Sequence, residues 1–136
     1  MPWVARHEGP RRVSGGLVLA VDAGVQTSAL SFTGLGSAGL LLLASCDAPA
    51  WLSLYVSAEA AAADAGRAQD MDPLPQAGLV LDAVFTDQLT ALRLPPGVSW
   101  ANQDEPQASV LHGRLRTDLP AQADVAVALT ALRLAA

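Results

Sequence analysis

The chain has 136 residues and a formal net charge of −5, and it is 51% hydrophobic, 15% charged and 4% aromatic. Its length suits one domain with a sizeable core. An acidic chain whose cations are all arginine is a poor nucleic-acid binder, since duplex binding needs clustered positive charge. We expect no membrane partner, because no apolar run approaches the roughly 18 residues of a transmembrane helix.

The low charged fraction also bears on how the surface is covered. A monomer with so few charges has little with which to solvate its exterior. We therefore expect part of the surface to be buried against copies of the chain or against another protein.

Residues 1–15 predict an extended N-terminal arm, because they contain proline, glycine and much of the local charge but no apolar period. We assign residues 16–136 to a single β-sandwich domain. A solvated arm is the simpler interpretation of the basic cluster near the start of the chain. The alternative is an arm that docks on a neighbouring subunit, for which the candidate residues are Trp3, Val4, Arg6, Arg11 and Arg12.

Beyond the arm, short apolar runs alternate with Gly, Pro, Asn and Asp, a spacing typical of strands. The expected strands are 17–21, 25–32, 40–46, 50–57, 79–85, 89–94, 98–101, 109–117 and 123–134. Two of these runs alternate with a period of two, which indicates one buried face. The residues expected to point inward are Leu52, Leu54, Val56, Leu111, Gly113 and Leu115. Those expected on the opposite faces are Trp51, Ser53, Tyr55, Ser57, His112, Arg114 and Arg116.

The run Leu40–Leu43 is continuously apolar and predicts a strand that is covered on both sides. It is followed by Ala-Ser-Cys46, which resembles the end of a bacterial lipoprotein signal. However, the apolar run is shorter than the roughly 7–15 residues of such a signal, and it lies late in the chain. We expect Cys46 to be a buried, unmodified thiol, and as the only cysteine it permits no internal disulfide.

One segment breaks the strand pattern. Residues 57–66 are rich in alanine and lack β-branched side chains, with Ser57 as an N-cap, Glu59 in the first turn and Gly66 as a stop signal. The segment predicts one short helix, followed by a loop with two prolines. Eight or nine strands with one helix predict an all-β, jelly-roll-like sandwich, and an immunoglobulin-like sandwich is the alternative.

Candidate catalytic and metal sites are sparse. The two histidines, His7 and His112, provide too few convergent ligands for a triad or a zinc site. The paired acids Asp70, Asp72, Asp104 and Glu105 could in principle bind calcium or flank a sugar. We interpret them as solvated loop residues. We predict no catalytic residue, no metal and no cofactor.

Aromatic side chains offer one further possibility. Trp51, Tyr55 and Trp100 could form a platform that stacks on sugars, which defines a carbohydrate-binding module as an alternative function. Exposed rings lining a groove favour that function, whereas burial of all three rings excludes it. We favour a place in the core or in a subunit interface for these residues.

Several segments resemble a domain of virion structural proteins of tailed phages, cyanophages in particular. The resemblance begins with Phe32-Thr-Gly-Leu-Gly and continues through Ala48-Pro-Ala-Trp-Leu-Ser-Leu-Tyr, Ala-Asp-Ala-Gly-Arg67 and Asp72-Pro73. It covers roughly residues 28–134. It implies a β-sandwich module that builds or decorates a particle, and it brings no catalytic residues.

Together these features predict a non-enzymatic virion protein, most simply a capsid cement or decoration protein. We expect a homo-oligomer, with a trimer favoured, whose arm contacts the major capsid protein or another virion protein. A place in the neck, tail, baseplate or fibre is the alternative.

Overall fold

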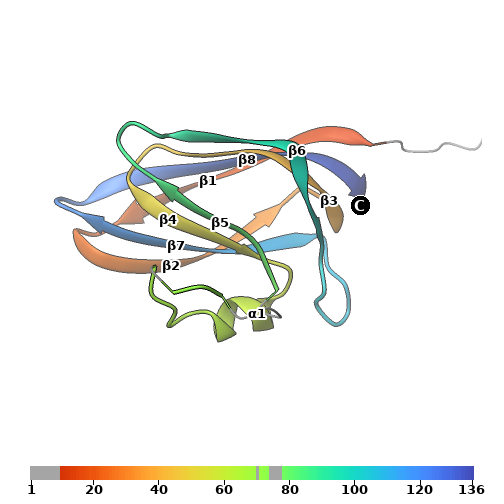
Figure 1. The fold of residues 1–136 in the computed structure, drawn as a ribbon, viewed down its shortest axis with the longest axis horizontal. Coiled ribbons are helices and arrows are strands. Elements are labelled where there is room, and N and C mark those ends of the chain that lie inside the picture. Colours follow the sequence, from red (N-terminus) through yellow and green to blue (C-terminus); the bar gives the residue numbers. More distant parts are fainter. Residues whose placement is uncertain (1–9, 70, 74–77) are drawn as a thin grey trace, which may run out of the picture.

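A computed structural model describes residues 10–69, 71–73 and 78–136, which form a two-layered β-structure with one short helix (Figure 1). The elements in chain order are β1 (Arg11–Val21), β2 (Gly24–Thr33), β3 (Ala38–Cys46), β4 (Ala50–Tyr55), α1 (Ala58–Ala63), β5 (Leu79–Phe85), β6 (Ala91–Ala101), β7 (Val110–Leu119) and β8 (Ala123–Ala135). Within these ranges no helix is long and apolar enough to cross a membrane.

The strands form two four-stranded sheets with the orders β1-β8-β3-β6 and β2-β7-β4-β5, and every pairing is antiparallel. Along the chain, consecutive strands alternate between the two sheets, and the one exception is the step from β4 to β5, which lie in the same sheet. This alternation produces the two Greek keys of a jelly roll and confirms the predicted all-β sandwich. It also excludes the immunoglobulin-like alternative, in which neighbouring strands pair within one sheet more often.

The core lies between the two sheets and is built from the inward faces of alternating strands. Leu52 and Leu54 of β4 are fully buried there, as are Leu111 and Leu115 of β7. Gly113, between the last two, allows Leu54 and Leu30 to approach its backbone closely. The predicted inward faces are therefore confirmed for Leu52, Leu54, Leu111 and Leu115, whereas β4 ends at Tyr55 and does not include Val56 and Ser57.

Two strands differ from the prediction by more than two residues. Residues 11–15 are not part of an arm, because they form the start of β1 and pair with the end of β8, from Arg11 opposite Arg133 onward. Residues 91–101 form one strand, β6, where we expected two separated by Pro95 and Pro96. Prolines are tolerated there because β6 is an edge strand and because its pairing with β3 is interrupted between Arg93 and Val98, so the missing N–H groups cost no ladder bond.

Strand β3 corrects another expectation. Leu41 is fully buried in the core, but Leu40, Leu42 and Leu43 are only half-buried. The pairing of β3 with its neighbours is irregular between Leu41 and Leu43. In the described residues no element packs on the outer face of this sheet. The leucine run is therefore covered on one side within the chain. Cys46 ends the strand and is buried, as predicted.

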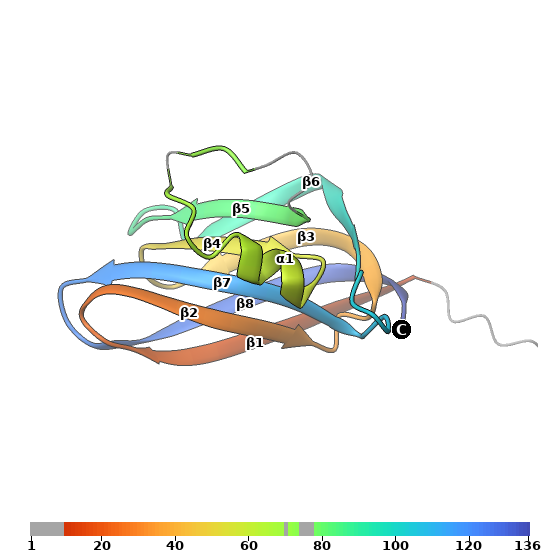
Figure 2. The same cartoon turned by 90° about the horizontal axis from the view of Figure 1, so that it is seen from below.

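The predicted helix is present but shorter. Ser57 caps α1 by accepting a hydrogen bond from the Ala60 backbone N–H at 3.0 Å, whereas the helix ends at Ala63 with Asp64 as C-cap, before Gly66. Figure 2 shows α1 on the outer side of the second sheet, alongside β4 and β7. The helix thereby covers the polar face of that sheet.

Candidate functional site: a polar cluster beneath helix α1

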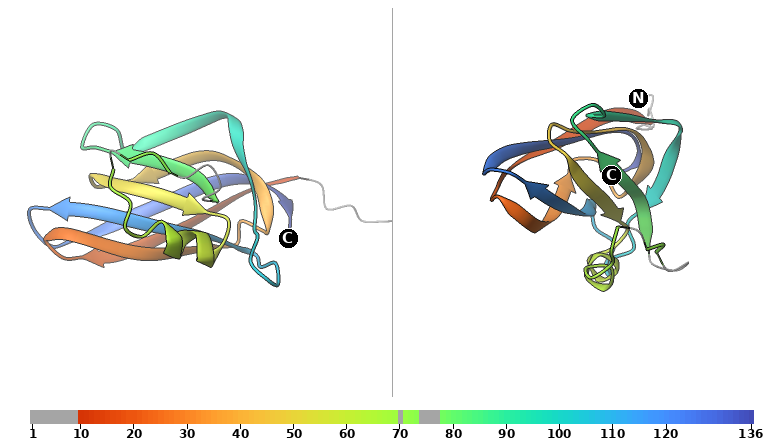
Figure 3. Two further views of the ribbon diagram at one scale, coloured as in Figure 1. Left: turned by 60° about the horizontal axis from the view of Figure 1, so that its bottom comes forward. Right: turned by 60° about the vertical axis from the view of Figure 1, so that its left-hand side comes forward.

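The most densely bonded polar side chains lie between α1 and the outer face of the second sheet. We call them the α1 cluster, and its members are Trp51, Ser53, Tyr55, Asp64, Arg67, Asp82, Arg114 and Arg116. They come from β4, from the end of α1 and the turn after it, from β5 and from β7. The left view of Figure 3 shows how the helix lies against these strands.

Trp51 is at the centre of the cluster. Two guanidinium groups lie over its ring, with the carbon Cζ of Arg116 at 3.9 Å and that of Arg67 at 5.0 Å from the ring centroid. The indole N–H donates to Asp82 Oδ1. The ring is 6% exposed, and desolvation strengthens such cation–π contacts.

Asp64 holds the helix to the sheet. Its Oδ1 accepts from Arg67 Nε at 2.8 Å and its Oδ2 accepts from the Tyr55 hydroxyl at 2.5 Å. Burial by itself raises the pKa of Asp64, but these two hydrogen bonds and the nearby guanidinium groups outweigh it, so the pKa lies below its usual value. Burial, followed by the bond to Asp64, raises the pKa of Tyr55. The carboxylate therefore stays ionised and the phenol stays neutral at neutral pH.

Asp82 has a similar environment on β5. Its Oδ1 accepts from Ser53 Oγ at 2.7 Å, and its Oδ2 accepts from Arg67 Nη1 at 3.1 Å. Burial again acts to raise the pKa of Asp82, and the bonds from Arg67, Ser53 and Trp51 lower it further than burial raises it. Arg67 thus bridges two carboxylates, which raises its own pKa above the usual range.

Two arginines of β7 bind backbone carbonyls at the C-terminal end of α1. Arg114 Nη2 donates to the Ala61 carbonyl at 2.8 Å, and Arg116 Nη2 donates to the Asp64 carbonyl at 3.0 Å. The last carbonyls of a helix have no partner within it and carry partial negative charge. The two arginines supply both the missing donors and the opposite charge.

A second polar group lies at the other end of α1, in the loop before β7. Asp104 accepts from the Ala58 backbone N–H at 2.9 Å and from Asn102 Nδ2 at 2.9 Å, and it lies 2.6 Å from His112 Nε2. The bond with His112, supported by the other two, lowers the pKa of Asp104 to about 2. Asn102 is itself buried and organises the loop through bonds to Val110 and Ala108.

An open hollow of about 300 Å³ adjoins the α1 cluster. It is lined by Trp51, Gln69, Arg116 and Asp118, together with apolar residues at the ends of β4 and β5. Of the charged residues in the lining, Arg116 already donates to Ser53 and to the Asp64 carbonyl, and Asp118 is exposed. In the described part of the chain, no group of three or more His, Cys, Asp or Glu side chains could hold a metal ion.

These contacts give the cluster a structural character. Its carboxylates have lowered pKa values, which suits ion pairing and does not suit a general acid at neutral pH. Ser53, the one hydroxyl besides Tyr55, lies 3.3 Å from Arg116 Nη1 and donates to Asp82, a carboxylate whose lowered pKa makes it a weak base. The cluster attaches the helix to the sheet.

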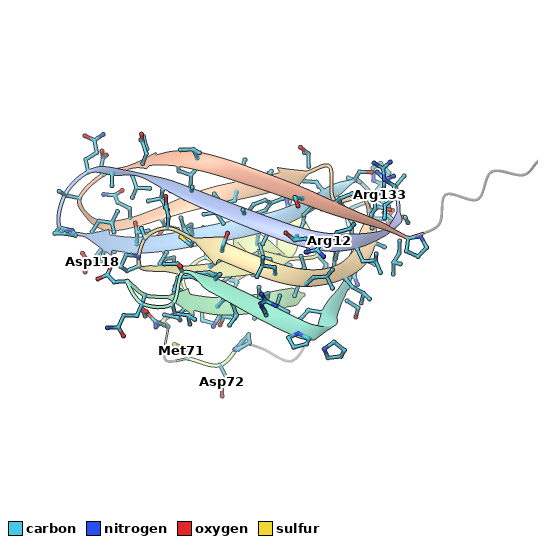
Figure 4. All side chains as sticks on the ribbon, turned by 90° about the horizontal axis from the view of Figure 1, so that it is seen from above. Arg12, Met71, Asp72, Asp118 and Arg133 are labelled. Atoms are coloured by element: carbon cyan, nitrogen blue, oxygen red, sulfur yellow. The ribbon has the colours of Figure 1, made fainter. Side chains whose placement is uncertain are left out.

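The residues that we predicted for partner docking fall into two groups. Arg11 and Arg12 are exposed at the start of β1, and Figure 4 shows Arg12 near the same end of the sandwich as Arg133. Trp3, Val4 and Arg6 lie outside the described residues, as do His7 and Asp70.

The predicted sugar platform is excluded for the rings that we named. Trp51 is 6%, Tyr55 0% and Trp100 5% exposed, so none of them presents a face on which a sugar can stack. The predicted acid pairs do not form a shared site either, because Asp104 binds His112 and Asp72 is exposed in a separate loop.

The α1 cluster itself was not predicted. The alternation of β4 and β7 placed Trp51, Tyr55 and two arginines on outward faces, and this was the available signal. Asp64, Arg67 and Asp82 join them only through the fold.

A comparison of the chain with family models, with curated proteins and with solved structures finds no match in any of the three.

Proposed function

We propose that the protein is a non-enzymatic structural component of a phage virion, and that it stabilises the particle as a capsid cement or decoration protein. Self-association and docking of the N-terminal arm on the major capsid protein are the proposed means. The sequence resemblance over residues 28–134 supports the assignment to a virion, and jelly rolls are frequent in viral capsid proteins. The neck, tail, baseplate or fibre is the alternative location.

The observation that carries the proposal is the nature of two sheet edges. β1 and β2 are the outermost strands at one side of the sandwich, and they are 11 and 10 residues long. Between Val13 and Cys46 the only charged residue is Asp22. Apart from Arg11 and Arg12 at the very start of β1, the two strands carry no charge. Long edge strands with few charges pair readily with other chains, so this side of the molecule suits assembly.

The opposite edges provide an internal contrast. β6 contains Pro95, Pro96 and Arg93, and β5 is only seven residues long and carries Asp82. Prolines, charges and short length are the usual means by which proteins keep sheet edges from pairing. The chain therefore protects one side of the sandwich and leaves the other side open.

The experiment that tests the function is detection of the chain in purified phage particles of its source, by mass spectrometry and imaging. We expect a regular array of copies on the particle. A variant lacking residues 1–9 should keep the fold, because β1 begins only at Arg11, and should no longer join the particle. Absence of the chain from particles contradicts the proposal, and full binding by the truncated variant contradicts the role of the arm.

A further inference from the structure

We propose that β1 pairs with β1 of a second copy of this chain, antiparallel about a two-fold axis at Leu17, so that two four-stranded sheets become one continuous sheet. This inference deepens the proposed function by naming the contact through which copies associate. It predicts a dimer as the elementary unit, in place of the trimer favoured by the sequence.

The pairing geometry restricts the possible registers. In an antiparallel pair about a two-fold axis, facing residues have numbers with a constant sum, and facing side chains lie on the same side of the sheet. In β1 the odd-numbered residues face the core, where Val13, Leu17 and Leu19 pack on it. The sum must therefore be even, because any odd sum places core residues opposite solvent residues.

One even register is favoured by charge. When the numbers of facing residues add up to 34, Leu17 lies on the two-fold axis. Arg12 of each copy then lies opposite Asp22 of the other copy. Neither side chain has an ion pair or a hydrogen bond with any other described residue. Because the axis generates the contact twice, Arg12 near the start of β1 and Asp22 just after its end are both neutralised by the partner's charges, whereas Arg11 faces Ala23.

The same register also matches side-chain size. On the outer face, Gly16 lies opposite Val18 of the second copy and Ser14 lies opposite Ala20. On the inner face, Gly15 lies opposite Leu19. Each glycine thus accommodates a larger residue on the neighbouring strand, and Val18, which is 71% exposed in the single chain, gains a neighbour.

Gly16 supports the inference independently. Its φ does not require glycine, and a Cβ placed on it makes only ordinary contacts, the nearest at 3.4 Å from the Val127 carbonyl oxygen. Glycine weakens a strand interior and often marks a place where another backbone approaches. Nothing in the described chain needs glycine at this position, and the close approach of a second strand is one arrangement that suits it.

The second open edge, β2, is compatible with this arrangement but does not determine it. Between Ala23 and Thr33 it has no charged residue, so no ion pair selects a register there. β2 lies at the same side of the sandwich as β1 (Figure 2). The rotation that pairs the two β1 strands therefore also brings the two β2 edges toward each other.

Disulfide trapping tests the register in the full chain. A mixture of the Ser14→Cys and Ala20→Cys variants should give a covalent dimer under mild oxidation, because facing Cα atoms of antiparallel strands lie about 4.5–5.5 Å apart, within disulfide reach. Each variant alone should give none. The native Cys46 is 1% exposed and does not interfere.

The matched control mixes Ser14→Cys with Val18→Cys, which face each other only if the register slips by two residues. Trapping in the control and not in the first mixture overturns the proposed register. Trapping in neither mixture, with an oligomer present in sedimentation, overturns the β1 contact. It leaves the proposed function intact, since that function requires association through some surface.

A charge swap provides a second readout by sedimentation of a concentration series. Arg12→Asp and Asp22→Arg each create two facing like-charge pairs and should weaken dimerisation roughly ten- to a hundredfold. The double variant restores both pairs and should recover wild-type dimerisation. Arg11→Asp changes the net charge as much as Arg12→Asp but faces Ala23, so it should have little effect.

Equal weakening by Arg11→Asp and Arg12→Asp, or no recovery in the double variant, overturns the proposed contact. A wild-type chain that stays monomeric at all concentrations and shows no trapping also overturns it. Detection of the chain in virions is measured separately, so a failure of the dimer and a failure of the virion assignment give different results.

Discussion

Arg67 is the residue on which the α1 cluster depends most. It bridges Asp64 and Asp82, and its side chain is 7% exposed. A buried ion pair adds little over an apolar substitute of similar size, but removing one partner leaves the other charge buried and unpaired. In this cluster a single deletion takes the main cationic partner from two carboxylates, and Asp64 is left with Arg116 only at 4.0 Å. The turn after the helix and β5 then lose their common partner.

We therefore expect Arg67→Met to lower the free energy of unfolding by about 3 kcal/mol, measured by urea denaturation. Arg93→Met is the matched control, because Arg93 is exposed on β6 and has no ion pair within the described residues. A loss for Arg67→Met no greater than that of the control would show that the cluster contributes nothing to stability.

Asp104 gives the fold a defined acid sensitivity. Its pKa in the folded chain is about 2, below the value of about 3.9 for an unfolded aspartate. The stabilising contribution is therefore complete above about pH 4 and is lost as the pH falls toward the folded value. Asp64 and Asp82, whose pKa values are also lowered, act in the same direction.

The Asp104→Asn variant should be less stable than the wild type at pH 6, because charge-assisted bonds to His112 and Ala58 are weakened. The difference between the two unfolding midpoints should shrink as the pH falls from 4 to 2. A difference that stays constant over this range would mean that Asp104 does not titrate with folding. The two midpoints are measured by thermal unfolding followed by circular dichroism.

At the scale of elements, α1 shows how much a short helix relies on its surroundings. It has six residues and none of them is buried, and a helix of this length is not stable by itself. Its N-terminus depends on Ser57 and Asp104, and its C-terminus depends on two arginines of β7. The helix is held at its ends and buries none of its alanine side chains.

Ser57→Ala removes the N-cap and should destabilise the protein by about 1 kcal/mol. Ser99→Ala, at an exposed position of β6, is the control and should be close to neutral. Urea denaturation distinguishes the two variants. Equal stability of both would contradict the capping role inferred from the bond to Ala60.

The elements also show where sequence patterns are informative. β4 and β7 were predictable because one face of each is buried and the other is polar, which produces a clear period of two. The start of β1 was not, because Ser14, Gly15 and Gly16 have no strand pattern and are ordered by β8, more than a hundred positions away. The prolines of β6 suggested a break, since a local pattern cannot reveal that a strand is at an edge.

At the scale of the whole molecule, the same limit applies to the α1 cluster. Arg67 and Asp82 are recognisable as charged residues, but only the jelly-roll pairing of β4 with both β5 and β7 brings them to Trp51. The fold class follows from composition and spacing. The polar contacts depend on topology, and the function predicted from the sequence remains a proposal.

The two ends of the described fold are neighbours, since Arg11 at the start of β1 lies opposite Arg133 near the end of β8. Chains whose ends meet tolerate circular permutation. A short linker could join these ends, and the chain could be reopened in the exposed connection 86–90 between β5 and β6. Every strand pair would be retained. The protein is therefore a natural scaffold for displaying an inserted peptide at a chosen site.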